Sequence, residues 1–133
     1  MSRSMHLFLA TKSGLEPLAQ EISSLLRMNL QRCADAHETW YEYEDATTVL
    51  TLGTHDFEND REMNFEDYQY DIELRALNLG ESEEREQRLA DLVKFVYQTL
   101  KATQKYHLLL VDNLQVKLAE FSPQSTVALT THT

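Results

Sequence analysis

Apolar residues in the first third of the chain repeat at helical spacing. From Leu15 to Leu30 they recur three and four residues apart, which places them on one face of an amphipathic helix. Ser13 precedes this stripe and Glu16 follows three positions later, which is the arrangement of a capping box. We therefore expect a helix that opens at Ser13 and ends near Leu30.

A second helical pattern lies between residues 82 and 105. Its first turns are acidic and its last turns contain lysines, which suits the dipole of a helix. We expect a second amphipathic helix over 82–105, whose core stripe consists of Leu89, Leu92, Val93, Val96 and Leu100.

Runs rich in β-branched and aromatic residues predict strands. The clearest is 68–77, where apolar and polar side chains alternate, so one face is buried and the other is in water. The segment 45–47 separates two such runs and is predicted to be a hairpin loop. The predicted strands cover 6–10, 39–44, 48–53, 68–77, 107–111 and 114–121, and residues 122–133 are expected to form an edge strand or a loose tail.

The order of these elements predicts the fold class. Strands outnumber helices and occur as hairpins, in the order β-α-β-β-β-α-β-β. We expect an α+β fold with a mostly antiparallel sheet of five to seven strands and two amphipathic helices packed on one face. A length of 133 residues predicts one domain over 1–133.

Composition favours a soluble protein in a reducing compartment. Cys33 is the single cysteine, so no intramolecular disulfide can form. No apolar run approaches the roughly 18 residues of a membrane span, and the N-terminal residues lack the features of a signal peptide. We expect a cytoplasmic protein with no membrane partner.

Negative charge is concentrated in one part of the chain. The formal net charge is -10, and residues 56–91 contain thirteen acidic and four basic side chains, so most of the imbalance lies there. Such a field attracts a basic protein and repels nucleic acid. The alternative is a solvated face that keeps the protein soluble. The predicted docking surface includes Asp56, Glu58, Asp60, Glu62, Glu66 and Asp67.

Two aromatic residues sharpen this prediction. Trp40 and Tyr41 are consecutive in a predicted strand, so their side chains point to opposite faces of the sheet. We expect one of them to lie outside the core, because exposed Trp and Tyr are favoured anchors at protein interfaces. A strand covered on both faces is the alternative. Both residues are included in the predicted docking surface.

Two histidines flank the predicted hairpin. A loop centred on Ala46 places His37 roughly opposite His55, with Asp56 and Cys33 close in sequence. This makes a metal site geometrically conceivable. Surface histidines at the open end of a hairpin are the alternative. His37 and His55 are therefore the candidate metal ligands.

Catalytic motifs are absent from the sequence. It contains no glycine-rich phosphate loop and no serine or cysteine nucleophile motif, so we expect no cofactor and assign no catalytic residue. His6 opens the first predicted strand and is interpreted as a structural histidine.

Residues 6–18 resemble the opening of the ferredoxin-like N-terminal domain of some ribosomal-RNA methyltransferases, mainly through Gly14-Leu15-Glu16. The resemblance covers about a tenth of the chain. No glycine-rich methyl-donor site follows, and the acidic balance opposes RNA binding. No function is carried over from it.

These patterns lead to one hypothesis and two alternatives. The hypothesis is a small acidic binding domain, monomeric or homodimeric, that docks a basic protein partner in the manner of an immunity protein or antitoxin. The first alternative is a small metal- or ligand-dependent enzyme that uses His37 and His55. The second is a structural subunit of a homo-oligomer that associates through a tyrosine-rich strand.

Overall fold

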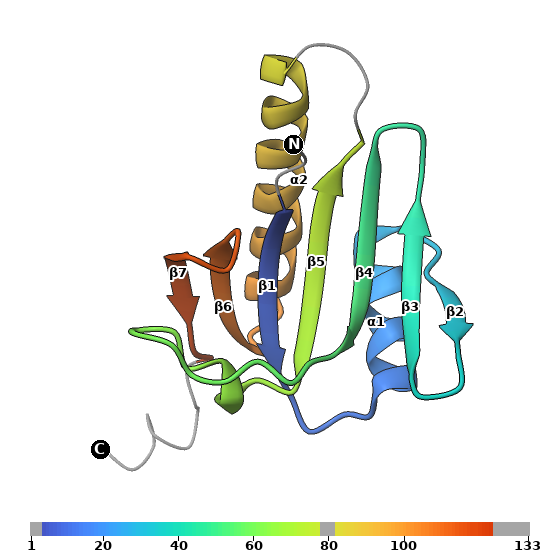
Figure 1. Ribbon diagram of the computed structural model, residues 1–133. Helices are drawn as coiled ribbons and strands as arrows, with labels where there is room; N and C mark the ends of the chain where they lie inside the picture. Colours follow the sequence, from blue (N-terminus) through green and yellow to red (C-terminus); the bar gives the residue numbers. More distant parts are fainter. Residues whose placement is uncertain (1–3, 78–81, 124–133) are drawn as a thin grey trace.

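The computed structural model describes residues 4–77 and 82–123. Its seven strands form one antiparallel sheet in the order β2-β3-β4-β5-β1-β6-β7, and two helices complete the predicted α+β fold (Figure 1). The predicted fold class is confirmed. The elements are β1 (Ser4–Ala10), α1 (Leu15–Leu26), β2 (Gln31–Ala34), β3 (Thr39–Glu44), β4 (Thr48–Thr54), β5 (Tyr70–Ala76), α2 (Ser82–Ala102), β6 (His107–Asp112) and β7 (Val116–Phe121), with a 3-10 turn at Phe65–Asp67 before β5.

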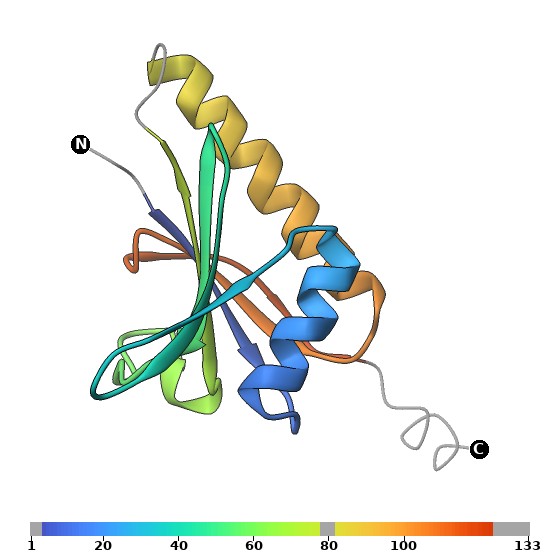
Figure 2. The same cartoon turned by 90° about the vertical axis from the view of Figure 1, so that its right-hand side faces the viewer.

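Both helices pack on the same face of the sheet, as Figure 2 shows with the sheet seen nearly edge-on. The main core lies between the helices and the sheet. Because side chains alternate along a strand, every second residue of the central strands enters this core. Completely buried residues of this core include Leu7, Leu50 and Ile72 from the sheet, and Ile22 and Leu100 from the helices.

The first helix is shorter than its apolar stripe predicts. Its N-cap is Gly14 and no side chain caps it, so the predicted capping box of Ser13 and Glu16 is wrong. The helix ends at Leu26 because Arg27 adopts a left-handed conformation with φ 57°, and its N–H bonds to the carbonyl of Ser23. The following residues therefore leave the helix and lead into β2.

Strand β2 was not expected, since Gln31 to Ala34 shows no apolar alternation. It forms by backbone pairing with β3, in which Cys33 lies opposite Trp40. At the other end of the chain, the tail prediction for 122–133 falls, from residue 124 onward, outside the described residues.

The predicted hairpin loop at 45–47 joins β3 to β4. The Asp45 carboxylate organises this turn. Its Oδ1 accepts hydrogen bonds from the backbone N–H groups of Thr47 at 2.8 Å and Thr48 at 2.9 Å, and its Oδ2 accepts one from the Tyr43 hydroxyl at 2.9 Å. These donors, led by the Thr47 N–H, lower the pKa of Asp45 from 3.8 to about 2.

The opposite face of the sheet carries a second, smaller core under residues 55–69, which we call the flap. The flap crosses the lower ends of β1 and β6 in Figure 1 and lies away from the helices in Figure 2. Asp60 and Met63 exchange two backbone hydrogen bonds within it. The core beneath it consists of Phe8, Met63, Phe65, Tyr68, Leu109 and Val111.

Strand β1 occupies the middle of the sheet. It pairs with β5, so that Met5 lies opposite Leu74, and with β6, so that Met5 also lies opposite Asp112. The flap covers the open face over β1 and β6. Among the described residues, no second layer covers the same face over β2 to β5 (Figure 2).

Candidate functional site

The register of the sheet brings carboxylates together on the open face, which we define as the face opposite the helices. Thr51 of β4 lies between Glu42 of β3 and Glu73 of β5, and Glu73 lies opposite His6 of β1. In the adjacent row, Asp71 lies opposite Gly53 and Phe8. Directly opposed residues share a face, so Glu42, Asp71 and Glu73 all project from the side that the helices leave open.

Positive charge on this part of the sheet is sparse. Within β2 to β5, all of which is described, the cationic residues are Arg32 and Arg75. Arg32 lies opposite Tyr41, which belongs to the helix-side core, so Arg32 projects to that side. Arg75 stays on the open face, with its Nε 3.8 Å from a Glu73 oxygen. The open face over β2 to β5 is therefore strongly acidic.

A hollow of about 200 Å³ lies in this acidic surface. Its floor depends on Gly53, because a Cβ added at this position would lie 3.3 Å from the Cβ of Trp40. A glycine inside a strand commonly marks such a close approach. Trp40 is half-buried and forms one wall. The lining consists of Glu38, Thr39, Trp40, Thr51, Gly53, Thr54, Asp71 and Glu73, and we call it the open-face hollow.

Beside this hollow, His6 is paired with two carboxylates. Its Nδ1 lies 3.0 Å from both Asp71 carboxylate oxygens, and its Nε2 lies 3.7 Å from a Glu73 oxygen. An ionised carboxylate only accepts hydrogen bonds, so Nδ1 carries the proton and donates it to Asp71. His6 is 5% exposed. The buried ring thus fixes Asp71 at the edge of the hollow.

Ser4, His6 and Asp71 have the order of a serine-histidine-aspartate relay but lack its catalytic geometry. The Ser4 hydroxyl oxygen is 3.4 Å from His6 Nε2, beyond the range expected for an activated nucleophile. A Glu73 oxygen lies 3.7 Å from the same nitrogen. Neither Ser4 nor His6 lines the open-face hollow. We therefore assign these residues to the support of Asp71.

The six acidic residues predicted for docking, from Asp56 to Asp67, are all exposed on the flap. Two of them also hold the flap together. Glu66 accepts a hydrogen bond from the Asn59 N–H at 3.0 Å, and Asp67 accepts one from the Asn64 side chain at 2.7 Å. The flap follows directly on Thr54, which lines the open-face hollow, so its charge is adjacent to that of the sheet.

The acidic start of α2 lies elsewhere. In Figure 1 the first turns of α2 are at the upper end of the sheet, and the flap is at the lower end. Glu83 and Glu84 are exposed at that upper end. The acidic stretch of the sequence, 56–91, is thus divided between the two ends of the molecule, and only its first part joins the open-face hollow.

The two aromatic residues predicted for docking, Trp40 and Tyr41, lie on opposite faces of the sheet. Trp40 faces the open-face hollow, whereas Tyr41 is buried in the helix-side core, 8% exposed. Tyr68 and Tyr70, from the predicted strand 68–77, are buried as well. Burial raises the pKa of Tyr68 to about 12.

The two candidate metal ligands have different surroundings. His37 is exposed in the turn between β2 and β3. His55 uses both ring nitrogens: Nε2 donates to the Tyr68 carbonyl at 2.6 Å, and Nδ1 accepts from the Phe57 N–H at 3.1 Å. A metal ion on His55 would have to displace one of these backbone groups. The described residues contain no group of three or more His, Cys, Asp or Glu side chains able to hold a metal ion.

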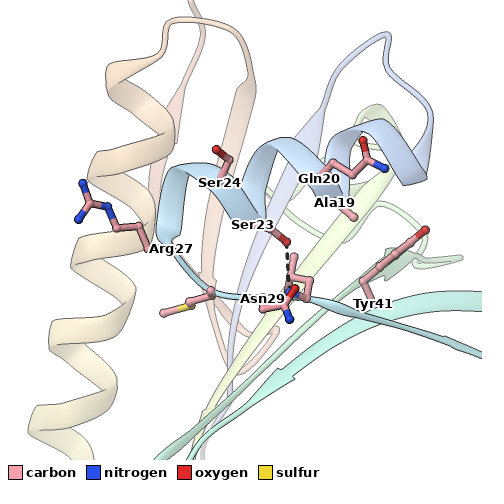
Figure 3. Close-up of a pocket in the computed structure, with 9 residues that line it drawn as sticks. Ala19, Gln20, Ser23, Ser24, Arg27, Asn29 and Tyr41 are labelled. Carbon is pink, nitrogen blue, oxygen red and sulfur yellow. Dashed lines mark hydrogen bonds between the residues drawn. The ribbon is translucent and has the colours of Figure 1, made fainter.

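A larger hollow of about 480 Å³ lies between α1 and β3 (Figure 3). Ser23 at its centre hydrogen-bonds through Oγ to the Leu30 N–H at 3.2 Å. The only charged residue of its lining is Arg27, whose side chain extends toward α2, away from Tyr41. The polar groups around this hollow therefore do not converge on one point, and we favour the open-face hollow as the functional site.

No family model matches the chain, and searches of curated proteins and of solved structures found no match to it. No helix in the described parts of the chain has the length and apolar character needed to cross a membrane.

Sequence reasoning missed most of this site. Glu38, Gly53, Asp71 and Glu73 were not among the predicted docking residues. One signal was present: a glycine inside a β-branched strand, in sequence next to Thr54 and the acidic flap. The pairing of His6 with Asp71 had no such signal, because it depends on the register between β1 and β5.

Proposed function

We propose that this protein is a cytoplasmic binding domain that docks a basic protein partner on the open face of β2 to β5. The observation that carries the proposal is the open-face hollow, where Trp40 and the carboxylates of Glu38, Asp71 and Glu73 border one depression. An inhibitor of the immunity or antitoxin kind is its most specific form.

Three physical features support this proposal. The acidic open face and the adjacent flap form one field that attracts a positively charged protein. A Trp beside a hollow is a common anchor at interfaces. The same field opposes binding to nucleic acid phosphates.

Charge-reversal variants test the location of the docking surface. Glu38→Lys/Glu42→Lys changes the charge of the open face, where Glu38 is exposed and Glu42 is half-buried. Glu83→Lys/Glu84→Lys is the matched control, because it makes the same change of charge at the opposite end of the sheet. Each form is used as bait in a lysate of the native organism at low salt, and bound proteins are eluted with rising salt.

We expect the wild type to capture a basic protein that salt releases, because screening weakens contacts between exposed charges. The open-face variant should lose this protein and the α2 variant should retain it. Equal capture by both variants would refute the open face as the docking surface. Absence of any salt-sensitive basic partner of the wild type would refute the proposed function itself.

A further inference from the structure

We propose that the open-face hollow receives a single arginine side chain of the basic partner. This inference rests on the proposed function and specifies the chemistry of its central contact. The guanidinium group stacks on Trp40 and pairs with the carboxylates of Glu73 and Glu38 over the open floor at Gly53.

The size of the hollow fits one side chain. A water molecule takes up about 30 Å³ in the liquid, so a volume of about 200 Å³ corresponds to roughly seven waters. An arginine side chain has seven non-hydrogen atoms beyond its Cα. Gly53 keeps this volume free, since any side chain there would fill the floor and press on Trp40.

The charges of the lining select a cation. Three of the eight lining residues are acidic and none is basic. Asp71 is held by His6 at 3.0 Å, so its charge is partly engaged. Glu73 remains available: its side chain is 33% exposed, and its oxygens lie 3.7 Å from His6 Nε2 and 3.8 Å from Arg75 Nε, too far for hydrogen bonds. Glu38 is exposed at the opposite wall.

The combination of groups favours arginine over lysine. A guanidinium is planar, stacks on an indole ring and donates two parallel hydrogen bonds to a carboxylate. Thr39, Thr51 and Thr54 add hydroxyl oxygens that can accept its remaining N–H groups. An ammonium group makes only a point contact and is more strongly hydrated.

Trp40 is the single tryptophan, so its fluorescence reports directly on the hollow. The full-length chain is titrated at low salt with the peptide acetyl-Gly-Arg-Gly-amide. The matched peptides contain lysine or the uncharged analogue citrulline instead of arginine. We expect a saturable change of Trp40 fluorescence with the arginine peptide, a weaker response to lysine and none to citrulline.

Two variants and one control locate the contact. Glu73→Gln should weaken binding of the arginine peptide about fivefold, the effect of losing one partly exposed ion pair. Gly53→Val should abolish the response by filling the hollow while every charge remains, with thermal unfolding used to confirm that this variant is folded. Glu44→Gln, which removes an exposed carboxylate of β3 outside the hollow, should stay within twofold of the wild type.

The outcomes separate this inference from the proposed function. If the arginine peptide gives no saturable response, or if Glu73→Gln and Glu44→Gln weaken its binding equally, the arginine site is refuted. If Glu73→Gln and Gly53→Val still capture the same basic protein from lysate, the hollow is not its central contact, although the docking function stands. If the peptide binds as expected but no basic partner is captured, the site stands and the proposed function fails.

Discussion

The turn between β3 and β4 provides a quantitative test of how this fold is stabilised. The substitution Asp45→Asn keeps the size of the side chain and removes its charge. In the native turn the charged carboxylate accepts hydrogen bonds from Thr47, Thr48 and Tyr43. The loss of charge should therefore weaken the hairpin without disturbing the core, because Asp45 itself is exposed.

The pKa of Asp45 gives the size of the stabilisation that its charge provides. A decrease of the pKa from 3.8 to about 2 corresponds to at most about 2.5 kcal/mol of stabilisation. The carboxylate is mostly exposed, so solvent screening reduces this to about 1 kcal/mol. Because the folded-state pKa lies below the unfolded-state value, this contribution is fully present above about pH 4. It is lost as the pH falls through about 2.

Urea unfolding of the wild type and Asp45→Asn at pH 7, 4 and 2.5 measures this contribution. We expect a difference of about 1 kcal/mol at pH 7 that shrinks toward pH 2.5. Glu44→Gln is the matched control, since Glu44 is an exposed carboxylate in the same hairpin whose loss should change stability by less than about 0.5 kcal/mol. A difference for Asp45→Asn that does not depend on pH would refute the electrostatic explanation.

Three further substitutions test individual contacts by urea unfolding. Tyr106→Phe should leave stability unchanged or raise it by about 1 kcal/mol, because the buried Tyr106 hydroxyl has no hydrogen-bond partner among the described residues. A marked loss of stability would show that this hydroxyl does form a hydrogen bond. Phe65→Ala should cost about 3–5 kcal/mol by opening a cavity beneath the flap, and an effect below 1 kcal/mol would contradict a packed second core. His55→Ala should cost about 1–3 kcal/mol, since the Phe57 N–H and the Tyr68 carbonyl lose their partner; retention of full stability would show that water replaces the ring.

The helices and most strands could be predicted because each shows its own periodicity. The stripe of α2 and the alternation in β5 report directly which side chains are buried. Strand β2 could not be found in this way, since its polar residues are held by backbone pairing with β3. The end of α1 depends on the left-handed backbone of Arg27, a residue type with no preference for that conformation.

The flap illustrates why the sequence predicts the candidate functional site only in part. Its acidic residues are obvious in the sequence and are exposed as expected. Met63 and Phe65, which anchor the flap, are two apolar residues among many acids, too few to establish a helical or a strand period. The open-face hollow depends on two strand registers, β3 with β4 and β4 with β5, that place Trp40, Gly53 and Asp71 together. Register is a property of paired strands that no single strand encodes.

The central position of β1 has a consequence for how the chain folds. Met5 must meet both Leu74 and Asp112, residues that the ribosome synthesises much later. The hairpin of β3 and β4 can form from local contacts alone, whereas the contacts of β1 close long loops and carry a high entropic cost. We expect β1 to join the sheet late, so until β6 emerges the nascent chain exposes the apolar residues of β1 to chaperones and to aggregation.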